Sequence, residues 1–247
     1  MSLETALRKI MTEFVAASAP GAGHEATLVA RDAWDLRVRC DLPAFSGLPI
    51  RSLTADDAGA LARFGGSLGP ASKRLFCPYP WDDAPALPAA FEHAVQQAVR
   101  HVDASYLMEA GGSNPIGHFF LWKAGANPTS LRHEVQVPEL GVAIADAWQA
   151  RGLGRLAVRI LLAVAADLHA DAVELTTATD NSAGWSTYQR CGFEYTGILR
   201  IPLGVDVTAV DAGEVSAATF RDERQMVCIL NPGRRQAVLD YLARKRA

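Results

Sequence analysis

The start of the chain carries apolar residues three to four positions apart, a spacing that is typical of an amphipathic helix. These residues are Leu3, Leu7, Ile10, Met11, Phe14 and Val15. The pattern predicts a helix over residues 3–19, which ends at the proline and glycine that follow. Two short apolar and β-branched runs at 27–30 and 36–40 then predict a hairpin.

From residue 50 onward, strand patterns alternate with helical ones. Strands are predicted at 50–53, 105–110, 116–123, 139–145, 172–177, 193–201 and 225–230. Helices are predicted at 54–64, 89–102, 152–169, 181–191 and 234–244, and prolines make 77–88 an irregular loop. This order predicts an α/β fold with a mixed, mostly antiparallel sheet flanked by helices, in which crossovers appear only late.

The length and composition suit one large domain with a sizeable core, because 49% of the 247 residues are hydrophobic. Prolines bound a connector at 43–49, which predicts a boundary near residue 47. We therefore expect an N-terminal appendage at 1–47, made of the helix and the hairpin, and a main domain at 48–247.

The charge balance excludes several classes of partner. With 24 basic and 27 acidic residues the net charge is -3, so neither nucleic acid nor an anionic membrane is an expected partner. No run reaches the roughly 18 apolar residues of a membrane helix, and Glu4 argues against a secretory signal. The four cysteines form no C-x-x-C pair. We expect a cytoplasmic protein with reduced thiols and no metal site.

A strand that leads through glycines into a helix, at 139–155, is the strongest chemical pattern in the sequence. The first turn of a helix offers unpaired N–H groups and a positive dipole end, which together bind phosphate. Gly152 and Gly154 leave room for a ligand at the backbone. Arg151, Arg155 and Arg159 recur every fourth residue, so the start of this helix is cationic on one face.

The same glycines also fit the dinucleotide fingerprint G-x-G-x-x-A, with Ala157 as its last residue. That fingerprint needs its first glycine immediately after a strand, whereas residues 145–151 intervene here. A nucleotide-dependent oxidoreductase is therefore the disfavoured alternative.

A second motif follows the next predicted strand. Its residues are Asn181, Tyr188, Gly192 and Phe193, in the order N-x-x-G-x-x-x-Y-x-x-x-G-F. Together with Gln149, Gly152 and Gly154, which match Q/R-x-x-G-x-G/A, this motif resembles the GNAT acetyltransferase superfamily. Gly184 stands where the family usually has alanine. The resemblance covers about residues 50–230 and is strongest at 139–199.

The resemblance implies a GNAT fold that binds acetyl-CoA as co-substrate between the strands at 139–145 and 172–177. Backbone groups of Val142, Ala143 and Ile144 would then pair with the pantetheine arm. The pyrophosphate site would comprise Gln149, Ala150, Arg151, Gly152, Leu153, Gly154 and Arg155. Asn181 would contact the pantetheine arm, and Tyr188 would protonate the departing thiolate as a general acid. A helix cap is the other role open to Asn181, and core packing is the other role open to Tyr188.

The attacking amine must also lose a proton. Glu139, on the strand beside the cofactor, is the first candidate base, followed by Glu134 and then His118. A solvated carboxylate at a strand end is the alternative for Glu139, and a buried histidine is the alternative for His118.

Substrate recognition is expected in the loop at 74–83, where aromatic and acidic residues alternate. Phe76, Tyr79 and Trp81 would line the acceptor site, with Asp82 or Asp83 attracting an ammonium group, unless the aromatics only pin a surface loop. The sequence thus predicts an N-acetyltransferase acting on a primary amine of a small molecule or a protein. A non-catalytic, regulatory acyl-CoA-binding module is the alternative, and a homodimer is one assembly that the sequence leaves open.

Overall fold

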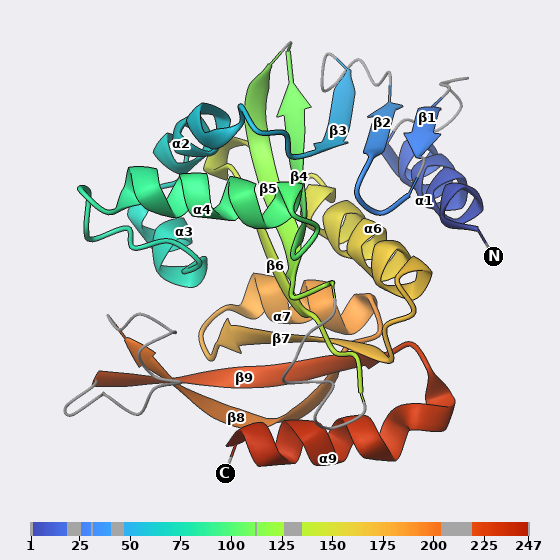
Figure 1. Cartoon of the computed structure of the whole chain (residues 1–247), viewed down its shortest axis with the longest axis vertical. Coiled ribbons are helices and arrows are strands. Elements are labelled where there is room, and N and C mark those ends of the chain that lie inside the picture. The colour runs from blue at the N-terminus through green and yellow to red at the C-terminus, as the bar shows by residue number, and fades with distance from the viewer. Residues whose placement is uncertain are drawn as a thin grey trace.

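One nine-stranded sheet organises the computed structural model, which describes residues 2–18, 26–30, 32–40, 47–111, 113–125, 135–203 and 219–246 (Figure 1). The strands are β1 (Ala26–Ala30), β2 (Leu36–Cys40), β3 (Leu48–Ser52), β4 (Ala104–Ala110), β5 (Asn114–Trp122), β6 (Glu139–Ile144), β7 (Ala172–Ala178), β8 (Glu194–Leu203) and β9 (Thr219–Ile229). Their order in the sheet is β1-β2-β3-β4-β5-β6-β7-β9-β8.

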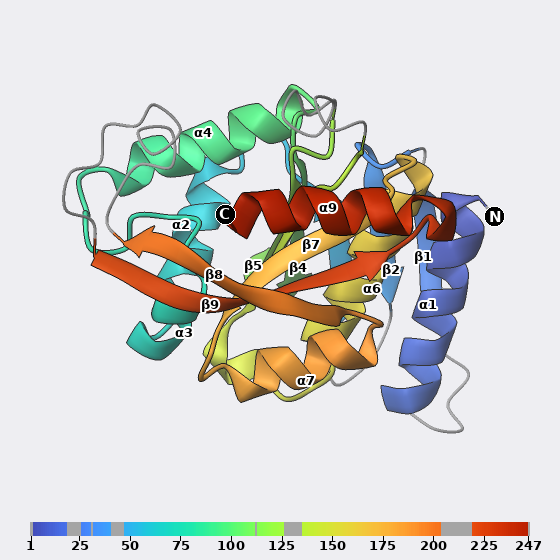
Figure 2. The same ribbon diagram turned by 90° about the horizontal axis from the view of Figure 1, so that it is seen from below.

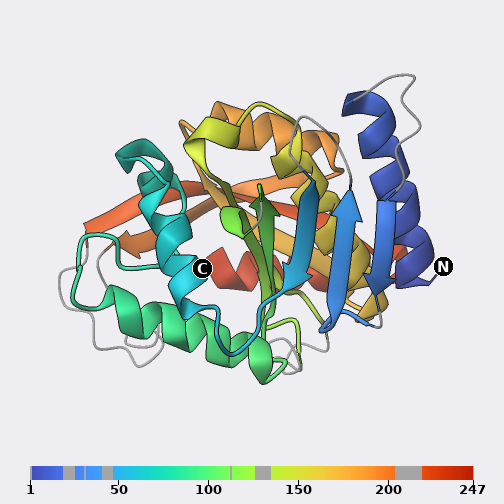
Figure 3. The ribbon, with the colours of Figure 1, turned by 90° about the horizontal axis from the view of Figure 1, so that it is seen from above.

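Helices cover both faces of the sheet. They are α1 (Leu3–Ser18), α2 (Ala58–Gly66), α3 (Pro70–Leu75), α4 (Leu87–Val99), α6 (Leu153–Asp167), α7 (Ser182–Arg190) and α9 (Arg235–Arg246), with short 3₁₀ turns η2 (Asp146–Trp148) and η3 (Pro232–Arg234). Figure 3 shows α2 and α4 on one side of the central strands and α6 and α7 on the other. We call the side of α2 and α4 the front face. Among the described helices, none has the length and apolar character needed to cross a bilayer.

The N-terminal helix and hairpin form as the periodicity predicts, with β1 and β2 antiparallel. They are not a separate unit, because β2 pairs with β3 in the same sheet. The apolar face of α1 packs on α6, and its residues belong to the same core cluster as the rest of the molecule. The expected boundary at residue 47 therefore divides a continuous sheet and a continuous core.

The central strands β3 to β6 pair with one another in antiparallel fashion. Residues of β4 and β5 are buried almost throughout, because α2 and α4 cover one face of these strands and α6 covers the other. The register of β5 and β6 runs without a break from the pair Gly117 and Ile144 to the pair Trp122 and Glu139. This continuous register fixes the face of the sheet on which each side chain of β6 lies.

The junction of β6 and β7 differs from every other described junction of the sheet, because it is parallel and has a single register pair, Glu139 and Glu174. At its base the Glu174 N–H donates to the Pro138 carbonyl at 3.1 Å, and the Asp171 N–H donates to the Gln136 carbonyl at 2.8 Å. Beyond Glu139 the two strands no longer pair. They form a V that is closed at Glu139 and Glu174 and open toward the carboxyl ends of both strands.

On the far side of the V, β7, β9 and β8 are antiparallel, and α9 crosses this part of the sheet (Figure 2). A small apolar cluster holds α9 in place. It consists of Val135, Val137, Ala172, Val227, Val238, Tyr241 and Leu242. β9 begins at Thr219, six residues before the predicted strand at 225–230, so β8 and β9 form a longer ribbon than the sequence pattern predicts.

Two helices between β3 and β4 depart from the prediction. The helix predicted at 54–64 begins only at Ala58 and ends at Gly66. The Asp57 carboxylate accepts hydrogen bonds from the N–H and the hydroxyl of Thr54 and pairs with Arg51, so it closes a turn before the helix instead of entering it. The short helix α3 was not predicted. Its Pro70, interpreted as an interruption, stands at the start of the helix, where proline is favoured.

Leu7 provides a test of how α1 contributes to the fold, because its side chain is fully buried in the core. We expect Leu7→Ala to lower the free energy of unfolding by about 2–5 kcal/mol, as cavity-forming substitutions in a core do. Thr12→Ala, at an exposed position of the same helix, should change it by less than about 0.5 kcal/mol. Denaturant unfolding of both variants is the measurement. Equal, small effects would mean that α1 is an accessory that the core does not need.

Candidate active site

The edge of β6 that faces the V has no strand partner beyond Glu139. In an antiparallel ladder, every second residue bonds the partner strand through its backbone N–H and C=O groups. The backbone groups of the residues between them point to the opposite edge of the strand. The Ala145 N–H donates to the Ile116 carbonyl at 2.8 Å. Because Ala143 lies two residues before Ala145, its backbone groups also point toward β5. Val142 and Ile144 therefore direct their backbone groups into the V. The register corrects the prediction for Ala143, whose backbone belongs to the β5–β6 ladder.

A strained turn connects β6 to α6. After η2 the chain passes through Ala150, with φ of 60°, and Gly152, with φ of 80°, before the helix begins at Leu153. Positive φ is costly for alanine and free for glycine. Such a conformation persists where the surrounding structure holds it, and it is frequent at binding sites. The turn directs the first N–H groups of α6 outward, where a helix offers an anion its unpaired donors.

The two glycines of the turn have different surroundings. A Cβ on Gly152 would lie 3.7 Å from the Phe14 ring of α1, an ordinary contact, so the positive φ is what requires glycine there. A Cβ on Gly154 would meet no atom within 4 Å. Gly154 is thus the position where the described part of the protein leaves open space beside the helix start.

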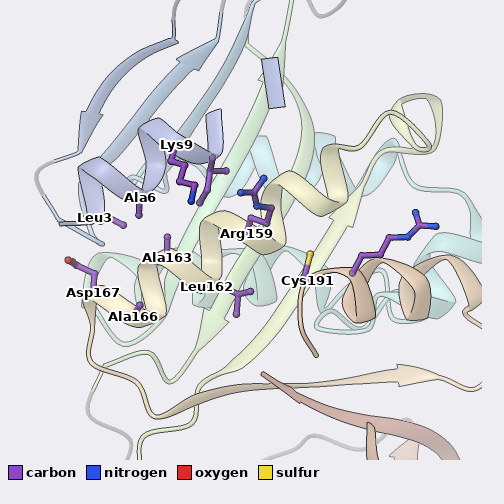
Figure 4. A pocket seen from close by; sticks show the side chains of 11 residues that line it. Leu3, Ala6, Lys9, Arg159, Leu162, Ala163, Ala166, Asp167 and Cys191 are labelled. Atoms are coloured by element: carbon purple, nitrogen blue, oxygen red, sulfur yellow. The ribbon is translucent and has the colours of Figure 1, made fainter. Parts of the chain in front are cut away.

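Two of the three predicted arginines, Arg155 and Arg159, lie four residues apart in one stripe on α6, whereas Arg151 precedes the helix. Arg151 stacks on Trp148, with 4.8 Å from its guanidinium carbon to the ring centre, and Arg159 pairs with Glu13 of α1 at 2.5 Å. Arg155 makes no hydrogen bond or ion pair with a described residue. The stripe continues into a groove of about 590 Å³ between α1, α6 and the end of α7, which Lys9 and Arg190 also line (Figure 4).

The short helix α3 lies across the open end of the V. On the β6 side, the Asp146 carboxylate accepts from the Gly69 N–H at 3.0 Å and from the Ser72 hydroxyl at 2.6 Å. On the β7 side, Arg74 pairs with Asp180 at 2.8 Å. α3 is therefore bonded to both arms of the V, a connection that the sequence pattern did not reveal because these partners lie 74 to 106 residues apart.

Gln149 takes part in the same connection. Its side-chain amide donates to the Ile144 carbonyl at 3.0 Å and to the Ser72 hydroxyl at 3.1 Å. In this structure the residue that matches the first position of the glycine motif thus holds the end of β6 against α3. Its side-chain amide is therefore engaged within the protein.

Asn181 and Tyr188 mark the two ends of α7. The Asn181 side chain accepts from the Gly184 N–H at 2.9 Å and donates to Thr177 at 3.0 Å, so it caps the helix. Tyr188 is buried in the last turn, and its hydroxyl makes no hydrogen bond with a described group. Burial, with a smaller contribution from Glu223, raises the pKa of Tyr188 to about 12. The phenol therefore keeps its proton at neutral pH.

The candidate bases have different environments. The Glu139 carboxylate lies at the closed end of the V, 3.4 Å from the Lys245 ammonium of α9, which also pairs with the buried Glu174 at 3.0 Å. Glu134 lies outside the described residues. His118 is fully buried, with one ring nitrogen 2.9 Å from the Ser105 hydroxyl. Burial lowers the pKa of His118 to about 3, so it is a neutral core histidine.

The predicted aromatic wall is largely a core cluster. Phe76 and Tyr79 are buried, and both pack on His118 of β5. The Tyr79 hydroxyl lies 3.3 Å from the second ring nitrogen of His118, and the Trp81 indole donates to the Phe76 carbonyl at 2.5 Å. These rings pin the loop. Asp82 and Asp83 are exposed, and Asp83 accepts from the Ala86 N–H, so the loop has an acidic rim. Of the predicted aromatics, Trp81 lines a cavity of about 540 Å³ together with Phe91 of α4.

A model of the acetyltransferase (GNAT) domain matches residues 48–194, which cover the V, the glycine turn, α6 and α7. The chain belongs to the GNAT acetyltransferase family. Members of this family use acetyl-CoA as co-substrate, and the structure fits it, with a free strand edge at Val142 and Ile144 and open space beside Gly154.

Individual GNAT proteins resemble the chain over parts of its length. It is 31% identical to N-alpha-acetyltransferase RimI from Mycobacterium tuberculosis over 118 residues, which cover 48% of this chain and 67% of the relative. It is 42% identical to mycothiol acetyltransferase from Tsukamurella paurometabola over 74 residues, 30% of this chain but only 24% of that longer relative.

Among solved structures, the acetyl-CoA complex of yncA from Salmonella typhimurium superposes with a TM-score of 0.54 at 16% identity. The match covers 75% of this chain and 95% of that one. At this identity the likeness shows the fold, and the GNAT fold is the mixed, mostly antiparallel sheet with flanking helices that the sequence predicted.

Gly152 and Gly154 form a matched pair for testing the turn. Gly154→Ala meets no protein atom and suits a helix, so the folded protein should keep its Tm while its affinity for acetyl-CoA falls at least about tenfold. Gly152→Ala must hold a side chain at positive φ, so it should cost about 1–2 kcal/mol of stability. Calorimetry with acetyl-CoA and thermal unfolding measure the two effects. Full affinity in Gly154→Ala would place the pyrophosphate elsewhere.

Proposed function

We propose that the protein is an N-acetyltransferase that transfers the acetyl group of acetyl-CoA to a primary amine by direct attack. The observation that supports this most is the V between β6 and β7. It joins a strand edge without a strand partner, at Val142 and Ile144, to the glycine turn, with Tyr188 on the helix that follows its far arm. Cleft, anion site and buried phenol together are what an acetyl transfer needs.

The cofactor would follow the V and the turn. The backbone groups of Val142 and Ile144 would pair with the pantetheine amides as a strand partner does. The N–H groups of residues 150–155 would bind the pyrophosphate. The free Arg155, and the groove that continues its stripe past Lys9 and Arg190, suit the remaining phosphate of coenzyme A. Asn181, whose amide has one donor hydrogen beyond its bond to Thr177, remains a candidate contact to the pantetheine arm.

The proposed reaction needs one base and one acid. Glu139 would accept a proton from the acceptor ammonium, directly or through one water, and the free amine would attack the thioester carbonyl. Ile144 and Val142 would hold that carbonyl by their N–H groups as negative charge develops on its oxygen. As the carbon–sulfur bond breaks, the Tyr188 phenol would give its proton to the thiolate, and the attacking nitrogen would lose its second proton to the phenolate, directly or through water.

The acceptor is proposed as a primary amine of a small molecule or of a protein. The exposed carboxylates of Asp82 and Asp83 on the loop beside the front face, with Glu139 at the closed end of the V, favour a cationic acceptor. RimI is named as an N-alpha-acetyltransferase, which supports including peptide α-amines in the search. A cytoplasmic location and a homodimer remain part of this proposal.

A regulatory module that binds acyl-CoA without turnover is the second candidate. It would need the glycine turn and would have no use for Tyr188 or Glu139. Calorimetry with acetyl-CoA, together with the release of free thiol across a panel of amines, separates the two candidates. Binding with no thiol release for any amine would favour the module, and tighter binding of NADH than of acetyl-CoA would exclude both.

Tyr188→Phe tests the acid. The ring packing stays and only the hydroxyl is lost, so kcat should fall by about 10²–10⁴-fold with little change in acetyl-CoA affinity. Tyr195→Phe, at an exposed tyrosine on β8, is the matched control and should leave kcat unchanged. Steady-state kinetics at saturating amine is the measurement. A fall of less than about threefold in Tyr188→Phe would assign the hydroxyl to packing alone.

The raised pKa of Tyr188 also predicts a pH dependence. A phenol with a pKa of about 12 stays protonated, and competent as a donor, well above the ordinary tyrosine pKa of about 10. The kcat of the wild type should therefore show no loss between pH 8 and about pH 10 from ionisation of this group. A decline centred below pH 10 that is absent in Tyr188→Phe would contradict the assignment.

A further inference from the structure

The closed end of the V holds an ammonium group that belongs to the chain itself. Lys245 Nζ lies 3.0 Å from Glu174 Oε1 and 3.4 Å from Glu139 Oε2. Glu174 is almost fully buried, whereas the side chains of Glu139 and Lys245 are 30% and 33% exposed, so solvent reaches this ion pair from one side. The two carboxylates come from the single register pair that closes the V.

The end of α9 is held at this place by further contacts. Arg246 donates to the Gln225 side chain of β9 at 2.6 Å, and the Gln225 amide in turn donates to Glu174 at 3.2 Å. Two successive residues of α9 are thus bonded to a buried polar row that runs from β9 to β7. Lys245 is a fixed part of the structure and not a free surface side chain.

Lys245 approaches Glu139 from the front face of the sheet. Directly opposite residues of an antiparallel pair share a face, so Glu139 lies on the same face as its partner Trp122. Trp122 packs against Phe120, and Phe120 packs against Phe76 of the loop that was expected to contact the acceptor. The ammonium of Lys245 and the proposed acceptor loop therefore lie on one face, on the side from which an acceptor would reach Glu139.

We propose that Lys245 occupies the position of the acceptor ammonium, so that α9 competes with the acceptor amine for Glu139. This inference rests on the proposed function, in which Glu139 is the base. A primary ammonium on a four-carbon chain is the chemical group that the acceptor would bring. An acceptor can therefore bind Glu139 only when Lys245 leaves the ion pair, and the protein is restrained by its own helix until it does.

The charges around Lys245 favour an ammonium group at this position. Burial lowers the pKa of Lys245, but the charges of Glu139 and Glu174 more than offset this and hold the pKa above its ordinary value. Lys245 stays an ammonium, which fills the cation position without being a nucleophile. It is expected to block transfer and not to become acetylated.

Lys245→Met tests the competition, because methionine keeps a similar volume and removes the charge. The assay is release of thiol from acetyl-CoA with n-butylamine, whose carbon chain and amine copy a lysine side chain. If Lys245 fills the site for most of the time, its removal should lower the KM for n-butylamine about tenfold or more, with the Kd for acetyl-CoA unchanged. Lys245→Arg, which keeps the cation, should retain the wild-type KM.

Arg244→Met is the matched control, since Arg244 is exposed on the same helix and makes no hydrogen bond or ion pair with a described residue. It removes the same charge and should leave the KM unchanged. Because Lys245→Met leaves Glu174 buried without its cation, Lys245→Met with Glu174→Gln keeps the test valid if the single variant unfolds. The double variant should show the same fall in KM.

The outcomes separate the inference from the function on which it rests. Equal KM values in Lys245→Met, Arg244→Met and the wild type, with normal acetyl-CoA binding and turnover, would overturn the competition alone. Failure of every variant to bind acetyl-CoA would overturn the proposed function. Turnover that appears only when Lys245 is replaced would support both.

Discussion

The parting of β6 and β7 is the constraint on which the rest of the molecule depends. A buried backbone group left without a partner costs free energy, so sheets rarely separate in their middle. Here Val142 and Ile144 lose their strand partner immediately after Glu139 and Glu174 meet. A ligand with amide groups in an extended arm can supply the missing partner, as we propose for the pantetheine arm of acetyl-CoA.

Both ends of the V are held by contacts between residues that lie far apart in the sequence. At the open end α3 is bonded to Asp146 on one arm and to Asp180 on the other. At the closed end Lys245 bridges Glu139 and Glu174. The separation of the strands is thus fixed by charged and hydrogen-bonded groups at its two ends, whereas the strands themselves are held by the apolar core beneath α6. This arrangement sets the width of the cleft before a ligand arrives.

Much of this fold follows from local patterns. The apolar period of α1, the alternation of β1 and β2, and the glycine turn before α6 all form where the sequence predicts them, because each depends on neighbouring residues. The turn that we propose for phosphate binding could be predicted for the same reason.

The sequence could not predict what depends on long-range partners. The polar groups that stabilise α3 lie far along the chain, whereas the cap formed by Asn181 was one of the two roles that the sequence left open, because its partner Gly184 is only three residues away. His118 and Phe76 have residue types suited to chemistry or recognition, but the helices that cover β5 bury them. In the sequence, Lys245 is one of several basic residues at a helix end, and only the fold brings it to Glu139.

The position of α1 beside the glycine turn has a thermodynamic consequence. Phe14 lies against Gly152, and Glu13 engages Arg159 on the same stripe that would bind phosphate. A ligand at this turn and the docking of α1 are therefore coupled, and any free energy that one contributes to the other is returned equally. At the proposed site, the N-terminal helix and the nucleotide end of the cofactor would be reciprocal effectors, although one is part of the chain and the other is a diffusing molecule.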